Sequence, residues 1–502
     1  MLGLWPLRSH PRIGSLRVSF SLSTFPDRGG ATSPDGRDPM AGRSAAPDLA
    51  RIGWSCIRST VCRRSGRTDE RTPQYMSMST IVVSRPALLG GSQAVSLDAA
   101  RTAEMNRWPI IGEEEVAAVA DVLRSGDLSL NPVTQALEAD YRQWLGVRHA
   151  LACCNGTSAI LAVLHSFDLQ PGDEVIVPSA TYWASVMPVL WCGAVPVFCE
   201  TEPDQLGLDP DDVERKVTPR TKAMIIVHLW GMPSKVDRLL EIAKRHRLKV
   251  LEDASHAQGA SWRGRAIGKL GDAAVFSLQT NKLAPAGEGG ILVTDNDAIH
   301  EHAICLGHFE RVLPLKTAAR RFAGTGWGLK HRMSPLSAAV ARVQLRHLQA
   351  RNARRNANIE YLSRRIEEFG VNTFLPPADV QRVYFQFLVQ NEQSKTGLTT
   401  DQLVAALRAE GCDALGPRYP LLHQQPVFTE DRFIDIARLR HLPRETLPRY
   451  RADDLPRTTA GNATLIQLPS FPSADRVLLD QYVLAFEKVL CAAREIAAAG
   501  IP

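Results

Sequence analysis

Asp253 and Lys282 are the residues of this 502-residue chain whose types and positions most directly indicate chemistry. His256 follows Asp253 by three residues, and Lys282 follows Ser277 by five. Each group comes directly after a short apolar run that is typical of a buried strand. A carboxylate and a lysine that meet at one site can stabilise a cationic ring and form an imine with a carbonyl.

Two further clusters also lie next to predicted buried elements. Asn155 is followed by Gly156, Thr157 and Ser158, and an apolar helical pattern begins there. The N–H groups and hydroxyls at such a helix start can hold a phosphate. Tyr182 lies just after another apolar run, where it offers an aromatic face.

Each of these signals has an ordinary structural explanation. A Gly-Thr-Ser helix start is usually a helix cap, and an aspartate after a strand is usually a loop residue. A lone lysine is usually solvated, and a histidine or tyrosine can simply belong to the core. Their order and shared position at strand ends favour function. Together they supply a phosphate-binding helix start, an aromatic ring, a carboxylate and a lysine, which are the groups that pyridoxal 5'-phosphate needs.

The elements that must position these residues follow from the periodicity. Short runs rich in valine and isoleucine predict strands at residues 174–178, 195–198, 223–228, 249–252, 274–278 and 290–294. Helical patterns at 113–125, 133–145, from 157 onward and at 236–246 precede or separate them. The alternation predicts an α/β fold with an open, mainly parallel sheet, which binds ligands at the carboxyl ends of its strands.

The alternation of strands and helices ends at about Pro335. A long helix is predicted at about 337–369, then a strand at 383–389 and a helix at 399–410. We therefore expect a large α/β domain over residues 78–345 and a small C-terminal α+β domain over 346–502. Residues 1–77, rich in arginine, serine and proline, are expected to be a disordered extension, an untranslated leader or a transit peptide.

Charge and cysteine content exclude several classes. The net charge of +6 arises entirely within residues 1–75, so the remaining body is neutral and no nucleic-acid partner is expected. The longest apolar stretch, 184–199, is interrupted and too short for a membrane span. Nine scattered cysteines without a CxxC pair indicate a reducing, cytoplasmic setting and no metal site.

Read together, these segments resemble the DegT/StrS-type sugar aminotransferases, a branch of the fold-type-I pyridoxal-phosphate enzymes. The resemblance covers about 108–472 and rests on eleven segments in the family's order. They include Trp108-Pro109, Asn155-Gly156-Thr157-Ser158-Ala159, Val227-His228-Leu229-Trp230-Gly231, Glu252-Asp253-Ala254-Ser255-His256, Gly287-Glu288-Gly289-Gly290 and Tyr419-Pro420-Leu421-Leu422-His423.

The resemblance implies a role for each matching residue. Lys282 would form the Schiff base and move the substrate proton, and Asp253 would pair with the pyridine nitrogen. His256 would lie beside the ring hydroxyl, and Tyr182 would stack on the ring. The phosphate would be held by Gly156, Thr157 and Ser277, with Ser158 as a weaker candidate. Substrate would meet Arg418, Tyr419 and His423.

One segment departs from the family. Many members carry an asparagine where this chain has Lys330, and that asparagine reaches the phosphate across a homodimer interface. Lys330 could do the same with a full charge, or it could be a surface lysine. The family otherwise implies a homodimer with shared active sites.

The implied reaction is a ping-pong transfer of an amino group. L-glutamine or L-glutamate would be the donor, and a keto sugar or keto-cyclitol the acceptor. Gln279 and residues 417–426 favour the keto-cyclitol branch. Two alternatives stay open: a dehydratase of the 3-amino-5-hydroxybenzoate synthase type, and a catalytically silent pyridoxal-phosphate-binding protein.

Overall fold

The computed structural model describes residues 84–204, 206–417 and 419–500. The expected extension at residues 1–77 and the expected substrate residue Arg418 lie outside the described residues. Within that part of the chain, no helix is both long enough and apolar enough to span a bilayer.

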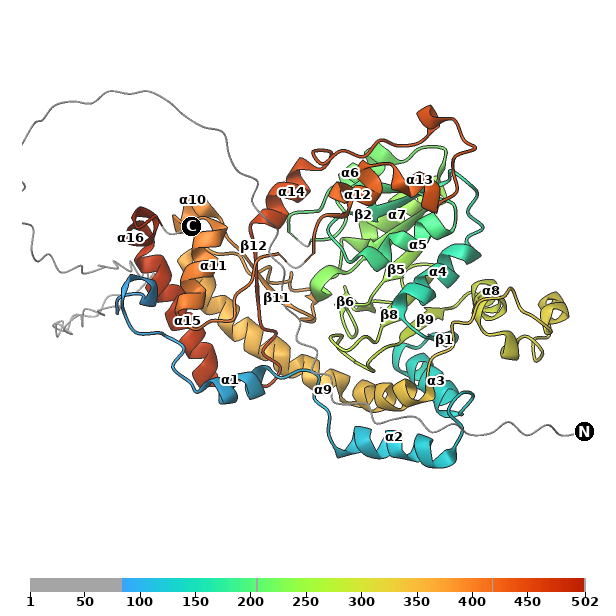
Figure 1. The fold of residues 1–502 in the computed structure, drawn as a ribbon, viewed down its shortest axis with the longest axis horizontal. Helices are drawn as coiled ribbons and strands as arrows, with labels where there is room; N and C mark the ends of the chain where they lie inside the picture. The colour runs from blue at the N-terminus through green and yellow to red at the C-terminus, as the bar shows by residue number, and fades with distance from the viewer. Residues whose placement is uncertain (1–83, 205, 418, 501–502) are drawn as a thin grey trace, which may run out of the picture. The chain divides into compact units, whose positions relative to one another are not determined.

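The predicted apolar runs form a seven-stranded sheet in the order β1-β9-β8-β5-β4-β2-β3 (Figure 1). Its strands are β1 His149–Cys153, β2 Glu174–Pro178, β3 Val195–Cys199, β4 Thr221–Val227, β5 Lys249–Asp253, β8 Ala273–Ser277 and β9 Gly290–Thr294. Neighbours from β8 to β3 are parallel, whereas β9 runs antiparallel to both β1 and β8. The predicted mainly parallel α/β sheet is confirmed, with β1 as an additional strand.

Helices cover both faces of this sheet. They are α2 Glu113–Ser125, α3 Val133–Leu145, α4 Gly156–Ser166, α5 Met187–Trp191, α6 Pro210–Lys216, α7 Val236–His246 and α8 Asp297–Gly307. Along β2, Val175 and Val177 join the core that includes α4, and Ile176 joins the core beneath α6 and α7. Burial on both faces explains why these strands are continuous apolar runs.

The long helix α9, Pro335–Ile366, leads into a second core that forms around two antiparallel strands (Figure 1). Its elements are β11 Phe387–Gln390, α10 Gln393–Thr396, α11 Thr400–Ala409, β12 Leu465–Leu468, α15 Arg476–Cys491 and α16 Ala493–Ala498. The remaining elements are short: α1 Ala99–Asn106, β6 Ser261–Trp262, β7 Arg265–Ala266, β10 Val380–Gln381, α12 Pro426–Thr429, α13 Arg432–Ile436 and α14 Pro456–Ala463.

The two cores exchange segments of the chain. Ala94 and Val95, near the start of the described residues, belong to the second core. Phe428, Phe433 and Leu455, far along the chain, belong to the core around the large sheet. The predicted domain boundary at residue 345 therefore stays a prediction. Each hydrophobic core contains residues from both sides of that position.

The strand predicted at 383–389 begins later than expected. Only Phe387–Gln390 forms β11, because the preceding residues pass close to the loop after β4. There the Val383 N–H donates to the Gly231 carbonyl at 3.2 Å. A Cβ on Gly231 would lie 2.0 Å from the Val383 carbonyl oxygen, so only glycine allows this approach. The contact brings Phe385 to the ligand edge of the sheet.

Candidate active site

A cavity of about 630 Å³ opens where β2, β4, β5 and β8 end. Eight of the twelve predicted site residues line it: Gly156, Thr157, Tyr182, Asp253, His256, Ser277, Lys282 and Tyr419. These residues are separated by up to 263 positions in the sequence, and the parallel strand ends bring them to one edge.

The start of α4 forms one end of this cavity. The Asn155 side chain accepts the Ser158 N–H at 2.8 Å and so caps the helix. Gly156 and Thr157, the first two helical residues, line the cavity together with Ser277. A Cβ on Gly290 would lie 2.5 Å from the Asn155 carbonyl, so this glycine lets β9 approach the helix start. A helix start with two N–H groups and two hydroxyls is suited to a phosphate dianion.

Asp253 lies at the end of β5 with 5% of its surface exposed. Ser185 Oγ donates to its Oδ2 at 2.6 Å, and the Ser255 N–H donates to its Oδ1 at 3.1 Å. Thr181 Oγ1 contacts Ser185 Oγ at 3.1 Å. Two donors therefore fix the plane of a buried carboxylate, which suits it to hold a cationic ring nitrogen.

Lys282 is held by its backbone in a turn. Its N–H donates to the Gln279 carbonyl at 2.8 Å, and its carbonyl accepts from Trp108 Nε1 at 3.0 Å. The side chain is 8% exposed, and Nζ lies 4.5 Å from the centre of the Phe385 ring. A fixed backbone and a flexible buried amine are what a nucleophile and proton carrier requires.

His256 is built into a stack of aromatic rings. Its ring is parallel to Phe385 at 4.1 Å and to Trp230 at 5.6 Å, and Trp230 stacks on Tyr419 at 4.8 Å. The backbone N–H of Trp230 donates to His256 Nδ1 at 3.3 Å, so the neutral imidazole ring carries its proton on Nε2. Tyr182, 42% exposed, lies at the mouth of the cavity.

A fully buried pair beneath the site supports the loops after β4 and β5. His228 Nε2 lies 3.2 Å from Glu252 Oε2, and His228 Nδ1 accepts the Ser234 N–H. Burial by itself would raise the pKa of Glu252, but the bonds from His228 and the N–H groups of Gly268 and Gly271 lower it below its usual value. The charged carboxylate thus fixes the turn that precedes β8.

The other four predicted residues are not among the described residues that line this cavity. Ser158 points toward Cys154, whose Sγ lies 3.3 Å from its Oγ. Lys330 is exposed on the segment before His331. Arg418 is outside the described residues.

His423, the fourth, is fully buried and acts as a support. Its Nδ1 accepts from Ser179 Oγ at 2.6 Å, and its Nε2 donates to the Ala452 carbonyl at 3.3 Å. Burial lowers its pKa, in keeping with a neutral ring. The geometry makes His423 a support for the loop that carries Tyr419, and its expected contact with substrate stays a prediction.

Ser179→Ala tests this support. The change would leave Nδ1 and the N–H of His423 buried without the Ser179 hydroxyl, which should lower the free energy of unfolding by about 1–3 kcal/mol. Urea denaturation measures it. Ser96→Ala, at an exposed serine, is the control and should change stability by less than about 0.5 kcal/mol. Equal stability of Ser179→Ala and the native chain would contradict the assignment.

Three residues of the site were not predicted: Ser185, Trp230 and Phe385. Ser185 lies within the Tyr182 cluster, and its position three residues after Tyr182 was a usable signal. Trp230 has a positive φ of 58°, and the following Gly231 has a positive φ of 89°, a backbone path that the sequence pattern does not reveal. Phe385 lies in a segment that the sequence predicts to be a strand. Only the packing of the folded chain shows that it belongs to the site.

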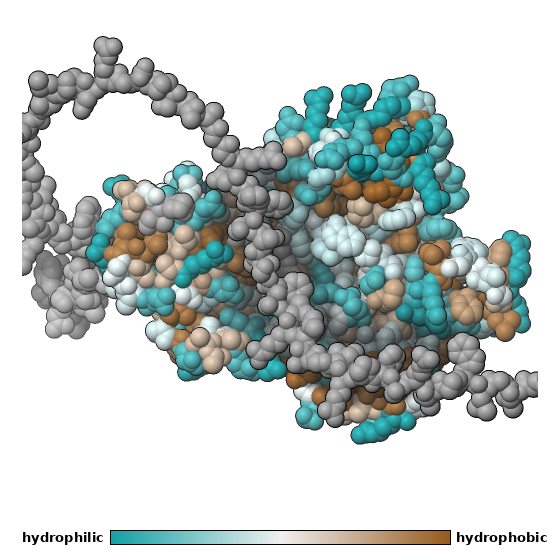
Figure 2. Space-filling view, in the orientation of Figure 1, coloured by the Kyte–Doolittle hydropathy of each residue, from teal (hydrophilic) through white to brown (hydrophobic). Residues whose placement is uncertain are grey.

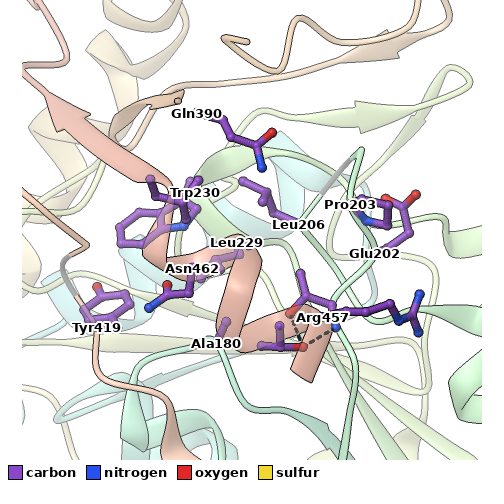
Figure 3. Close-up of a pocket in the computed structure, with 14 residues that line it drawn as sticks. Ala180, Glu202, Pro203, Leu206, Leu229, Trp230, Gln390, Tyr419, Arg457 and Asn462 are labelled. Atoms are coloured by element: carbon purple, nitrogen blue, oxygen red, sulfur yellow. Dashed lines mark hydrogen bonds between the residues drawn. The ribbon is translucent and has the colours of Figure 1, made fainter. Parts of the chain in front are cut away.

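A smaller cavity of about 90 Å³ adjoins the first and shares Tyr419 with it. Figure 3 shows Trp230 and Tyr419 on one side and Glu202 and Arg457 on the opposite side. Arg457 pairs with Asp209, and Glu202 pairs with Lys235. The two charged side chains that line this smaller cavity are therefore paired with other residues of the chain. Among the described residues, no three His, Cys, Asp or Glu side chains are grouped to hold a metal ion.

Comparison with known proteins agrees with this geometry. Residues 109–441 match the DegT/DnrJ/EryC1/StrS aminotransferase family. DesV of S. venezuelae, solved with a ketimine intermediate, is 31% identical; the match covers 80% of this chain and 99% of DesV, with a TM-score of 0.65.

Two other solved structures give similar matches. DesI, solved in the presence of its TDP-sugar product, is 29% identical, with coverage of 83% and 99% and a TM-score of 0.66. The 3-amino-5-hydroxybenzoic acid synthase is 27% identical, with coverage of 76% and 98% and a TM-score of 0.66. The chain therefore belongs to the DegT/DnrJ/EryC1/StrS aminotransferase family and has the fold of the type-I pyridoxal-phosphate aminotransferases.

Proposed function

We propose that this enzyme transfers the amino group of L-glutamine or L-glutamate to the ketone of a keto sugar or keto-cyclitol, with pyridoxal 5'-phosphate as cofactor. The observation that carries the proposal is the convergence of Lys282, Asp253 and the start of α4 on one cavity. An amine, a carboxylate and an anion site are the complementary groups for a phosphorylated pyridine aldehyde.

The residues present fit the cofactor. Gly156, Thr157 and Ser277 would hold its phosphate, and Asp253 its ring nitrogen. His256 Nε2 would donate to its ring hydroxyl, and Tyr182 would cover a ring face. When bound, the cofactor supplies an electron sink for the carbanion formed as the donor loses its α-proton.

The chain's own residues then have separate tasks. Lys282 Nζ would take the proton from the donor's α-carbon, and in the second half-reaction it would return a proton to the acceptor's carbon. Asp253, oriented by Ser185, keeps positive charge on the ring. The stack of Phe385, His256 and Trp230 shields this side of the cavity from water.

The acceptor is proposed from two kinds of likeness. DesI was solved with a TDP-sugar product, which favours a nucleotide-linked keto sugar. Gln279, which lines the cavity, and residues 417–426 favour a keto-cyclitol. The likeness to 3-amino-5-hydroxybenzoic acid synthase supports a second candidate, in which the same lysine drives loss of water.

A homodimer completes this proposal. Val116 and Leu123 of α2 are each 54% exposed, whereas Glu115 of α2 is buried and accepts from Gln344 of α9. Beyond α8, Figure 2 shows apolar side chains on the projecting segment at the right, where Leu313 and Trp327 are exposed. Exposed apolar faces of this kind mark subunit contacts. Lys330 lies in the same segment and would reach the partner's phosphate site.

Absorption spectroscopy tests the proposed function. The purified protein should show a visible cofactor band that bleaches when L-glutamine is added and returns with an acceptor ketone. A folded protein that never takes up pyridoxal phosphate would contradict the proposal. A band that no amino donor changes would favour the catalytically silent binding protein.

A further inference from the structure

A second cavity, of about 230 Å³, lies behind the Lys282 segment. Its walls come from Trp108, Asn281, Arg355 of α9, Phe385 and Gln467 of β12. Asn281 and Phe385 also line the 630 Å³ cavity, so the two cavities meet at these residues. Nothing in the proposed roles of the cofactor-binding residues uses this space.

Buried polar atoms without hydrogen-bond partners gather in this second cavity. Among the described residues, the orphaned atoms include Nε and Nη1 of Arg355, Oδ1 of Asn106 and Oε1 of Gln467, and all three residues line the cavity. Native proteins leave few buried polar atoms unpaired, so such a cluster indicates a polar ligand.

Arg355 is the strongest of these groups. It is 1% exposed, and its guanidinium carbon lies 3.8 Å from the centre of the Trp108 ring. Within the described residues no carboxylate bonds to its Nε or Nη1. Burial, and then the charge of Arg351, lowers its pKa to about 9. A buried guanidinium without a carboxylate favours a ligand that presents a planar oxygen acceptor.

The other groups define what else the ligand must offer. Asn106 Oδ1 and Gln467 Oε1 are acceptors, and Asp413, an acidic residue, lines the same cavity. A carboxylate ligand would satisfy Arg355 alone and would face the charge of Asp413. A carboxamide matches both sets, because its oxygen accepts from Arg355 and its NH₂ group donates to the oxygens.

The position relative to Lys282 then identifies the ligand. Lys282 Nζ lies 4.5 Å from the centre of the Phe385 ring, and Phe385 lines both cavities. We propose that the second cavity binds the side-chain carboxamide of the amino donor while its α-amino group lies beside Lys282, which makes L-glutamine the preferred donor. The inference rests on the proposed function and assigns Arg355 and Gln467 to donor specificity.

Arg355→Met tests the assignment by single-turnover bleaching of the cofactor band with three donors: L-glutamine, L-glutamate and L-alanine. The second-order rate constant for L-glutamine should fall by about 30-fold or more, because a buried charged hydrogen bond is lost. For L-alanine, which has no side-chain carboxamide, the rate constant should change by less than about threefold. A parallel fall with L-alanine would place the α-carboxylate at Arg355 and overturn the inference.

Two further variants keep the test decisive where Arg355→Met fails to fold. Gln467→Leu should lower the L-glutamine rate constant by about tenfold. Asp413→Asn removes the charge that opposes a carboxylate and should shift the preference toward L-glutamate by about three- to tenfold. Unchanged preference in both variants would overturn the inference.

A binding measurement separates recognition from turnover. Calorimetry on Lys282→Ala protein should show weaker L-glutamine binding when Gln467→Leu is added, by about tenfold. Equal binding in the two proteins would overturn the inference. If no amino acid bleaches the native protein, the proposed function itself fails, which is a different result from loss of donor preference.

Discussion

Replacing Lys282 with alanine is expected to lower the rate of amino transfer by about a hundred- to ten-thousandfold, the contribution of a positioned acid/base group. The loss should affect both half-reactions, because the same Nζ carries the proton in each. The fold should survive, since the Lys282 backbone bonds to Gln279 and Trp108 do not involve the side chain. Stopped-flow absorbance with each substrate measures the effect.

Two controls make that result specific to the amine. Lys282→Arg keeps a long basic side chain at this position but cannot form the imine, so it should be as inactive as the alanine variant. Lys222→Ala, at an exposed lysine whose Nζ donates to the Pro219 carbonyl, should retain full activity. Substantial turnover by Lys282→Ala would show that another base serves the reaction.

The central sheet is the part of the fold that the sequence predicts best. Residues of β2 and β9 are buried along their whole length, so their apolar runs have sharp limits and the predicted bounds match. β1 was missed because His149–Cys153 contains alanine, histidine and cysteine, which have weak strand preference. It is a strand because β9, more than 130 residues later, pairs with it.

The residues of the site also differ in how well the sequence predicts their positions. Asp253, Lys282 and the start of α4 could be predicted, because a strand end fixes where each must lie. Phe385 and Trp230 could not, since their positions depend on the contact between Gly231 and Val383. His423 was expected at the substrate because the resembled family brings this segment towards it, whereas the loop turns its side chain inward to Ser179. Local spacing does not determine the direction of a loop side chain.

The second large effect is expected from Asp253→Asn. A carboxylate beside the ring nitrogen raises the pKa of that nitrogen by about 1–3 units, and each unit is about tenfold in the protonated fraction. The neutral amide removes this effect, so kcat/KM should fall by about 10- to 1000-fold. The asparagine also cannot keep both existing bonds, because Ser185 and Ser255 each donate to an oxygen of Asp253.

Two comparisons separate charge from geometry in this variant. Ser185→Ala removes one donor to the carboxylate but keeps its charge, and should cost about tenfold or less. A cofactor methylated at the ring nitrogen carries a permanent positive charge and should restore part of the activity of Asp253→Asn. If the methylated cofactor gives no recovery and Ser185→Ala is equally impaired, Asp253 acts through orientation alone. Recovery confined to Asp253→Asn would show that the carboxylate works by keeping the ring charged, which is the role that its burial at the end of β5 is suited to.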